Sequence, residues 1–300
     1  MTHSVSIAPG IGATIYGQLP RDVSPELVAA CDHVTLHTAA DASDVQTAER
    51  VRQLGCDRVW LAIPANYLVR KGDSAAVAEV ERCARVARDM GAELFELNGE
   101  GSSDGQKPGD WIPATHVEGR RLALLAGALL DAARDVLGDT CAVSWTSHDM
   151  PGFRLPWREI LSRVDIHSPQ HYPAQAGRSV GQRELEARIQ RSRGRWEALA
   201  EQGEIPGNAV PYGDRWVPYL QGHGHTPGAL VWGLCEAPVV RLWAYPGSWS
   251  PEAIPALRRA RAIRSNTDVT LPDVVARWQQ AQGLDPDGVV GPKTLAALGA

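Results

Sequence analysis

The stretch Glu93-Leu94-Phe95-Glu96-Leu97-Asn98-Gly99-Glu100 decides the fold, because it alternates apolar and polar residues just after a helix-stopping glycine, Gly91. Alternation with a period of two predicts a β-strand with two different faces. The apolar side chains would point to one side, and Glu96, Asn98 and Glu100 would point to the other. Polar side chains on an inward face are costly unless they are paired, hydrated or used in chemistry. We therefore expect this strand to lead into a functional site.

A strand-then-helix pattern recurs along the first 265 residues, and several of its helical segments end at glycines such as Gly55, Gly91 and Gly138. Eight such units in about 255 residues predict a (β/α)8 barrel of the TIM type. The competing fold is a doubly wound open sheet, which is disfavoured because no Gly-x-Gly-x-x-Gly turn follows the first strand. The predicted strands are Ile11–Gly17, His33–Thr38, Arg58–Pro64, Glu93–Glu100, Thr140–Thr146, Val164–Tyr172, Asn208–Tyr212 and Val239–Tyr245.

Composition restricts the class of protein. The chain has 300 residues and a formal net charge of −5 at pH 7, which argues against a general nucleic-acid binder. Its five scattered cysteines favour buried thiols over a disulfide framework or a zinc cluster. No apolar run approaches the ~20 residues of a membrane span, and Met1 to Gly10 lacks the pattern of a signal peptide. We expect a monomer that needs no cofactor and no metal.

The C-terminal residues form a separate pattern after a polar linker. Asp273 to Leu284 is a helical pattern, a turn follows, and Pro292 opens a final helix. This tail resembles the second half of the type-one peptidoglycan-binding repeat through Gln279, Gly283, Leu284, Asp287, Gly288, Val290, Gly291, Thr294 and Leu298. We expect a barrel over residues 1–265 and a partial wall-binding module over 266–300. The tail is either a reduced wall-binding module or a fragment docked on the barrel that no longer binds, and docking is favoured because a core this small is marginal alone.

The tail's resemblance implies bacterial peptidoglycan as the partner, and a barrel with acids at its strand ends then suggests a glycosidase. The spacing Glu93-x-x-Glu96-x-Asn98-x-Glu100 is similar to the strand-four signature of glycoside hydrolase family eighteen, Asp-x-x-Asp-x-Asp-x-Glu. The family twenty-five lysozymes have a similar Asp-x-Glu on strand four. By this resemblance Glu100 is the catalytic acid, and Asn98 takes the place of an Asp that orients the substrate's N-acetyl group. Asn98 departs from both families, since an amide can hold a substrate amide but carries no charge.

Glycosidic cleavage also needs a second group, which stabilises the oxocarbenium ion or activates water. Asp214, predicted at the end of the seventh strand, is the first candidate for that carboxylate, with a turn residue paired to Arg215 as the alternative. Asp149, predicted at the end of the fifth strand, is the next candidate. Glu96 is either catalytic or a structural carboxylate buried lower in the barrel. Retention and inversion of configuration both stay open.

Aromatic residues near the predicted strand ends are candidates for stacking against sugar rings. Trp and Tyr combine a flat apolar face with a polar edge, which suits both carbohydrate binding and core packing. Both alternatives stay open for Tyr172, Trp216, Trp243, Tyr245 and Trp249.

Two other functions compete with the glycosidase. His167, His171, His223 and His225 would be zinc ligands in a wall amidase or peptidase, although no His-Glu-x-x-His motif occurs. A degenerate barrel that binds the wall without catalysis is the third possibility, with Asn98 as the first sign of decay. The preferred glycosidase looks like a phage-type endolysin, which implies synthesis in the cytoplasm and release to the wall through a holin-type pore.

Overall fold

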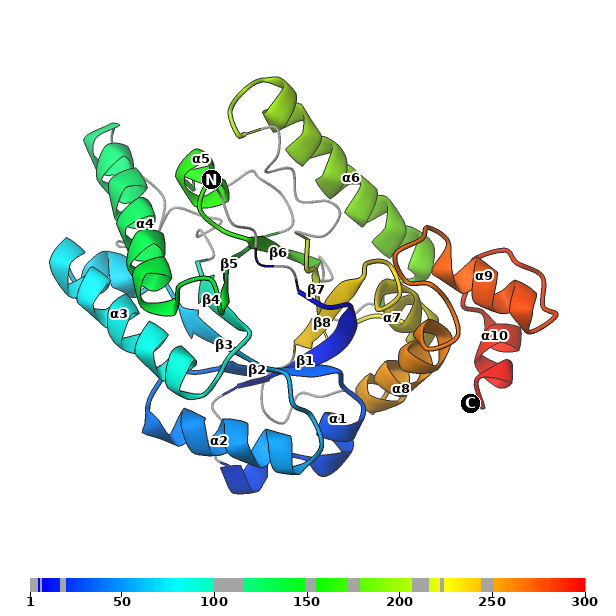
Figure 1. The fold of residues 1–300 in the computed structure, drawn as a ribbon. Coiled ribbons are helices and arrows are strands. Elements are labelled where there is room, and N and C mark those ends of the chain that lie inside the picture. The colour runs from blue at the N-terminus through cyan, green and yellow to red at the C-terminus, as the bar shows by residue number, and fades with distance from the viewer. Residues whose placement is uncertain are drawn as a thin grey trace.

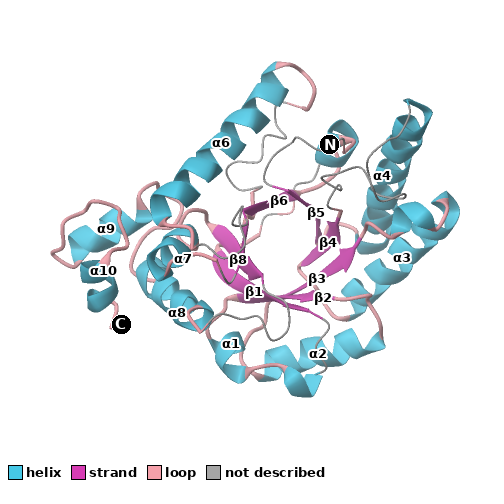
Figure 2. Ribbon diagram, turned by 180° about the vertical axis from the view of Figure 1, so that it is seen from behind, coloured by secondary structure: helices cyan, strands magenta, loops and turns pink. Residues whose placement is uncertain are grey.

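The computed structural model shows a closed barrel of eight parallel strands in chain order, with β8 pairing back to β1 (Figures 1 and 2). It describes residues 5, 7–16, 20–99, 116–148, 155–171, 179–206, 216–221, 224–243 and 251–299. The predicted TIM-type (β/α)8 fold is therefore confirmed. The strands are β1 (Gly10–Tyr16), β2 (His33–His37), β3 (Val59–Pro64), β4 (Leu94–Asn98), β5 (Ala142–His148), β6 (Ile166–His171), β7 (Tyr219–Gln221) and β8 (Val239–Trp243).

Helices surround the strands on the outside of the barrel (Figure 2). Three of them end as the sequence predicted, because Gly55, Gly91 and Gly138 adopt positive φ angles of 96°, 62° and 59° just after the helical residues. The described helices are α1 (Pro25–Ala29), α2 (Ala42–Gln53), α3 (Asp73–Asp89), α4 (His116–Leu137), α5 (Trp157–Leu161), α6 (Gln182–Glu201), α7 (Pro227–Gly233), α8 (Ala253–Arg264), α9 (Val274–Ala281) and α10 (Pro292–Ala297). Short 3-10 turns occupy Pro20–Asp22 and Leu68–Arg70.

The position predicted for the seventh strand is wrong. The strand that closes the barrel between β6 and β8 is Tyr219–Gln221, whereas the predicted segment 208–212 lies outside the described residues. Sequence patterns did not predict this strand because it has only three residues and follows Pro218. Proline has no N–H to donate to a ladder, although the Pro218 carbonyl still accepts from Arg241 N at 3.0 Å.

The barrel wall has one apolar and one mixed face. Side chains that point outward, such as Phe95 and Leu97, are fully buried in the layer between the strands and the helices, as predicted. The inner face has an apolar layer at the end where the strands begin, made of Ile7, Trp60, Leu94, Ala142, Ile166, Val217 and Val239. Above this layer the interior becomes polar, and that change places the chemistry toward the C-terminal ends of the strands.

The five cysteines are buried free thiols, as the sequence predicted. None of the described helices has both the length and the hydropathy that a membrane crossing needs.

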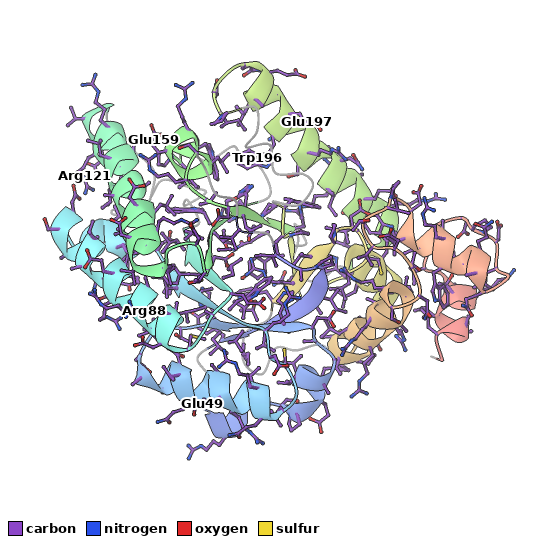
Figure 3. The ribbon with its side chains drawn as sticks, in the orientation of Figure 1. Glu49, Arg88, Arg121, Glu159, Trp196 and Glu197 are labelled. Atoms are coloured by element: carbon purple, nitrogen blue, oxygen red, sulfur yellow. The ribbon has the colours of Figure 1, made fainter. Side chains whose placement is uncertain are left out.

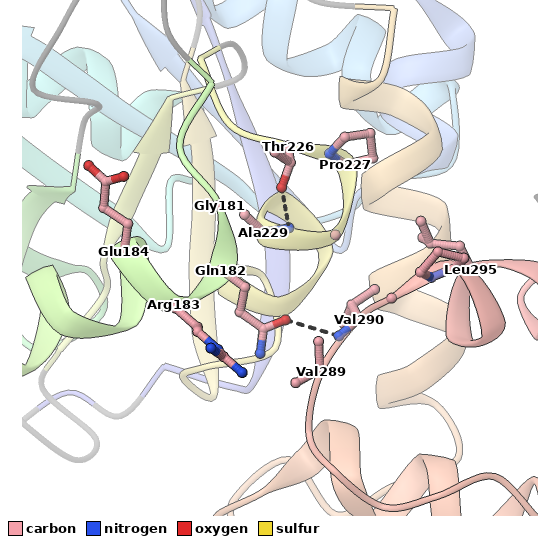
Figure 4. Close-up of a pocket in the computed structure, with 13 residues that line it drawn as sticks. Gly181, Gln182, Arg183, Glu184, Thr226, Pro227, Ala229, Val289, Val290 and Leu295 are labelled. Atoms are coloured by element: carbon pink, nitrogen blue, oxygen red, sulfur yellow. Dashed lines mark hydrogen bonds between the residues drawn. The ribbon is translucent and has the colours of Figure 1, made fainter.

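The tail docks on the barrel beside α6, α7 and α8 (Figure 1). Val274, Val275 and Trp278 of α9 are at least 94% buried and belong to the same apolar cluster as the barrel helices. A polar contact adds to this packing: Gln182 at the start of α6 donates to the Gly288 carbonyl at 2.8 Å and accepts from Val290 N at 2.9 Å (Figure 4). The expected docking is thus confirmed.

The tail also has its own polar centre. Gln279 is 2% exposed, and its Nε2 atom lies 3.0 Å from each of three acceptors, the Asp287 carboxylate, the Val289 carbonyl and the Thr294 hydroxyl, which share its two N–H donors. Its oxygen accepts from Gly288 N at 2.9 Å. One glutamine therefore ties α9, the turn and α10 together, and the turn that it fixes is the one that Gln182 holds.

Replacing Gln182 by Ala should loosen the joint between tail and barrel. Two backbone groups of the tail lose their partners, which costs about 1–3 kcal/mol of unfolding free energy. Chemical denaturation and limited proteolysis should show lower stability and faster cleavage after residue 265. Arg195→Ala, an exposed change further along the same helix, is the control and should change neither. Equal behaviour of the two variants would contradict a joint held by Gln182.

Candidate active site

The mouth of the barrel is the end where the strands finish. Asp149 and Tyr172 follow directly after β5 and β6 in the sequence, and Glu100 and Tyr245 come two residues after β4 and β8. All four lie outside the described residues, as do Asp214 and Trp249. Their predicted roles therefore stay predictions, and the described geometry of the site begins one or two residues before them, at the last residues of the strands.

Strand β4 is anchored at its end by a tryptophan from β5. The Trp145 indole N–H donates to the Gly99 carbonyl at 3.1 Å, and the ring lies so close that a Cβ added at Gly99 would stand 2.3 Å from it. Only glycine fits there without displacing the ring. The backbone at Gly99, directly after Asn98, is thus fixed by the packing of the strand–helix layer.

Glu96 lies inside the barrel, two residues below Asn98, and forms a buried ion pair with Arg241 of β8. Both side chains are fully buried, and Arg241 Nη2 donates to Glu96 Oε2 at 2.5 Å. The Tyr219 hydroxyl donates to the other carboxylate oxygen at 2.7 Å. The Ser144 hydroxyl donates to Oε2 at 3.0 Å, and Arg241 also donates to the Ser168 hydroxyl at 2.6 Å.

These contacts decide the ionisation of Glu96. Burial alone would raise the pKa of its carboxyl group, but the Arg241 charge and the hydrogen bonds outweigh burial and hold the pKa below 4.5. The guanidinium carbon of Arg241 lies 3.8 Å from the centroid of the Tyr219 ring, so the cation is stacked as well as paired. A fully enclosed carboxylate that is paired with Arg241 fits the structural alternative that the sequence left open for Glu96.

Asn98 contacts a histidine that the sequence interpretation did not select. Its Nδ2 atom lies 3.0 Å from Nε2 of His37, the last residue of β2. The His37 ring stacks on Tyr16 of β1 with centroids 4.7 Å apart and planes 17° apart. Burial lowers the pKa of His37 to about 4, against the opposing charge of Glu96. The one available signal was the alternation in β2, which puts His33, Thr35 and His37 on the inward face.

The two described tryptophans proposed for sugar binding lie in different places. Trp243 is the last residue of β8 and half-buried, and it shares the inward face with Arg241 two residues earlier. Trp216 is 5% exposed, belongs to the apolar layer between strands and helices, and bridges to His167 near the start of β6. Trp243 is therefore at the mouth, whereas the position of Trp216 matches the core-packing alternative.

The correction to β7 changes the case for Asp214. Because β7 begins at Tyr219, Asp214 precedes the seventh strand in the sequence instead of ending it. The reason for choosing Asp214 was that it followed this strand, and that reason is wrong. Asp149 still follows β5, which ends at His148.

Two histidines of the zinc alternative, His167 and His171 of β6, pack outside the barrel interior. His167 is within 2.8 Å of the Ser147 hydroxyl and packs edge-on against Trp157 and Trp196. His171 is fully buried and packs against Trp216. His223 lies outside the described residues, and the described part of the chain contains no group of three His, Cys, Asp or Glu residues placed to hold a metal.

A family model described as a putative peptidoglycan binding domain matches residues 260–298. The C-terminal segment thus carries a domain of this type, as its sequence indicated. The match begins inside α8, which ends at Arg264, so the last barrel helix and the tail belong to the matched segment together. No curated protein sequence matches the chain.

Solved structures with a similar fold include glycoside hydrolases. A family 18 chitinase from Flavobacterium johnsoniae has a TM-score of 0.56 at 7% identity, over 85% of this chain and 94% of that one. An endo-β-N-acetylglucosaminidase from Cordyceps militaris has a TM-score of 0.53 at 11% identity, over 85% and 90%. A family 18 N-acetylglucosaminidase from Paenibacillus barengoltzii has a TM-score of 0.53 at 8% identity, over 84% and 99%. At these identities the likeness concerns the fold.

Glu96→Gln should destabilise the barrel strongly. The amide leaves the Arg241 charge buried without its counter-ion, and breaking such a pair costs about 3–5 kcal/mol. The wild-type carboxyl group has a lowered pKa, so its contribution is present above pH 4.5 and is lost as the pH falls through its folded value. Chemical denaturation between pH 3 and 7 should show a flatter pH dependence for the variant.

The control is Glu197→Gln, which breaks an exposed pair with Arg193 on α6 (Figure 3) and should cost less than about 1 kcal/mol. Wild-type stability in Glu96→Gln, combined with loss of activity, would instead support the catalytic alternative for Glu96.

Proposed function

We propose that this chain is a peptidoglycan hydrolase, a glycosidase that cleaves the N-acetylhexosamine chain of the bacterial cell wall. The observation that carries the proposal is that one chain joins a segment of the peptidoglycan-binding type to a (β/α)8 barrel whose interior is polar toward its mouth. The named chitinase and N-acetylglucosaminidases of similar fold act on N-acetylated sugars, and they support this substrate class. The wall-binding segment supports peptidoglycan as the particular polymer.

Glu100 is the proposed general acid. It comes two positions after Asn98, whose strand is fixed by Trp145 and whose amide is held by His37. A carboxylic acid that protonates the leaving oxygen is required for this reaction. Asn98 offers an uncharged amide next to the proposed acid Glu100. The negatively charged group that the reaction needs must therefore come from another strand.

Asp149 is the better candidate for that partner once β7 is placed correctly. It follows β5, the neighbour of β4 in the sheet, and C-terminal strand ends carry the catalytic groups of such barrels. Trp243, at the end of β8 and on the inward face, is proposed as a sugar platform, together with Tyr172 and Tyr245.

The tail holds the enzyme on its polymer. Because α9 packs into the same apolar cluster as the barrel helices, binding of the tail to the wall also fixes the direction in which the mouth faces. A tethered catalytic site experiences a high effective concentration of substrate. We place this activity in endolysin-type lysis, in which the enzyme reaches the wall through a separate membrane pore.

Glu100→Gln should abolish cleavage with little change in fold. Loss of the general acid lowers the rate by about 10²–10⁴-fold, whereas a surface change of the same kind should have no effect. Purified peptidoglycan would be incubated with wild type, with Glu100→Gln and with Glu49→Gln, an exposed control on α2 (Figure 3). Mass spectrometry of the soluble fragments should show new reducing-end sugars from wild type and from the control only.

Other products would change the conclusion. Release of free stem peptides, blocked by a chelator, would replace the glycosidase with the zinc-dependent amidase or peptidase. Binding to the wall without any soluble fragment from wild type would leave a wall-binding protein on a degenerate barrel. A Glu100→Gln variant as active as the wild type would move the acid to another residue.

A further inference from the structure

The docked tail and the barrel enclose a groove between them (Figure 4). Its volume is about 560 Å³. The starts of α6 and α7 line it from one side, and α10 and the turn before it line it from the other. The helices of such a barrel begin at the end where the strands finish, so the groove lies on the mouth side of the molecule. Neither the barrel nor the tail forms this groove alone.

The backbone of the tail is held on both sides at the groove. Val290 N donates to the side-chain oxygen of Gln182 at 2.9 Å. The Val290 carbonyl lies so close to Gly228 of α7 that a Cβ added at Gly228 would stand 2.1 Å from the oxygen, so only glycine allows this approach. The starts of α6 and α7 are tied to each other as well, because Thr226 N donates to the Val180 carbonyl at 2.9 Å. The groove is therefore already formed before a ligand binds.

The walls of the groove are aliphatic. Pro227 and Ala229 of α7 contribute from the barrel, and Val289, Pro292 and Leu295 contribute from the tail. None of the described residues that line the groove is aromatic, so it lacks the flat faces of Trp and Tyr on which sugar rings stack. Walls of this kind fit the small aliphatic side chains of a peptide better than they fit a sugar chain.

Arg183 places a positive charge at the groove. It is the second residue of α6, it is exposed, and it lines the groove beside Gln182 (Figure 4). Its guanidinium group has no ion-pair partner in the part of the chain that the structure describes. The carboxylate of Glu184 points away from the tail (Figure 4). The free charge at the groove is therefore a guanidinium group, which can bind a carboxylate through two parallel hydrogen bonds.

We propose that this groove binds the stem peptide of peptidoglycan, with Arg183 paired to one of the peptide's carboxylates. Stem peptides are short, contain alanine residues and carry free carboxylates, so they match both the aliphatic walls and the positive charge. This inference rests on the proposed function and deepens it, because it assigns the sugar chain to the mouth and the peptide to the groove. The peptide site then belongs to the barrel and the tail jointly, and the enzyme prefers glycan strands that still carry their peptides.

Substitutions at Arg183 test the charge without disturbing the core, because the side chain is exposed. Arg183→Lys keeps the charge but loses the planar fork, Arg183→Ala removes the charge, and Arg183→Glu reverses it. Val289→Asp puts a carboxylate into the aliphatic wall, at a residue that is 40% exposed. The matched control is Arg195→Ala, which removes an exposed arginine of α6 that does not line the groove. Thermal unfolding of each variant shows that it is folded.

The experiment measures kcat and KM for release of reducing ends from two substrates: uncrosslinked peptidoglycan strands with their stem peptides, and the same strands after an amidase has removed the peptides. Wild type and Arg195→Ala should prefer the peptide-bearing strands, and Arg183→Lys should keep part of this preference. Arg183→Ala should raise KM on those strands by about threefold to tenfold, the effect of one exposed charge-assisted contact. Its kcat should not change, because the contact is equally present before and during the reaction.

The other two variants extend the test. Arg183→Glu and Val289→Asp should raise KM on the peptide-bearing strands further than Arg183→Ala, because each brings a negative charge toward the peptide's carboxylate. On the stripped strands, every variant should match the wild type.

The outcomes distinguish the two proposals. Release of reducing ends from neither substrate by wild type overturns the proposed function, and the inference falls with it. Equal kcat/KM of the wild type on the two substrates overturns the inference alone. The inference is also overturned if Arg183→Ala behaves like Arg195→Ala, or if its KM rises equally on both substrates, which would assign the groove to the sugar chain.

Discussion

The buried ion pair between Glu96 and Arg241 is the contact on which the interior of the barrel depends. It joins β4 to β8 through the barrel, at a level where Tyr219 of β7, Ser144 of β5 and Ser168 of β6 add hydrogen bonds to the pair. A carboxylate or a guanidinium group alone at this depth would be prohibitively costly to desolvate. Together they allow a polar layer to stand between the apolar floor of the barrel and its mouth.

That layer determines what lies above it. Asn98 is the next inward residue after Glu96 on the same strand. The Glu96 charge opposes the lowering of the His37 pKa by burial, and His37 contacts the Asn98 amide. Trp145 fixes the next residue, Gly99, from the outside of the barrel. The end of β4 is therefore constrained on both faces, as the proposed function requires of groups that must keep a fixed geometry.

The tail belongs to the barrel physically as well as in sequence. Val274, Val275 and Trp278 share the apolar cluster of the barrel helices, and Gln182 of α6 holds the turn that Gln279 organises. The matched wall-binding segment starts inside α8. A short module that is marginal alone thus obtains part of its core from the barrel.

Sequence patterns predicted the parts of the molecule that depend on local periodicity. The alternation in β4 identified its inward face. Gly91 and Gly138 marked helix ends because a helix end depends on the backbone conformation of one residue, which glycine adopts easily. Arg241 could not be assigned to Glu96, since the two are 145 residues apart and periodicity does not reveal which inward residues meet. The short strand β7 after Pro218 was not predicted because three residues are too few to show a periodic pattern. Asp214 was therefore wrongly placed at the end of the seventh strand. His37 was not selected because its contact with Asn98 crosses β3, and such a contact leaves no pattern in the sequence.

The central claim is that this barrel cleaves a glycosidic bond of the wall. The most direct test is borohydride reduction of wild-type peptidoglycan digests, followed by identification of the reduced sugars. The account predicts newly formed amino-sugar alcohols, and muramitol or glucosaminitol would name the bond. New amino termini on stem peptides, without any new reduced sugar, would contradict it.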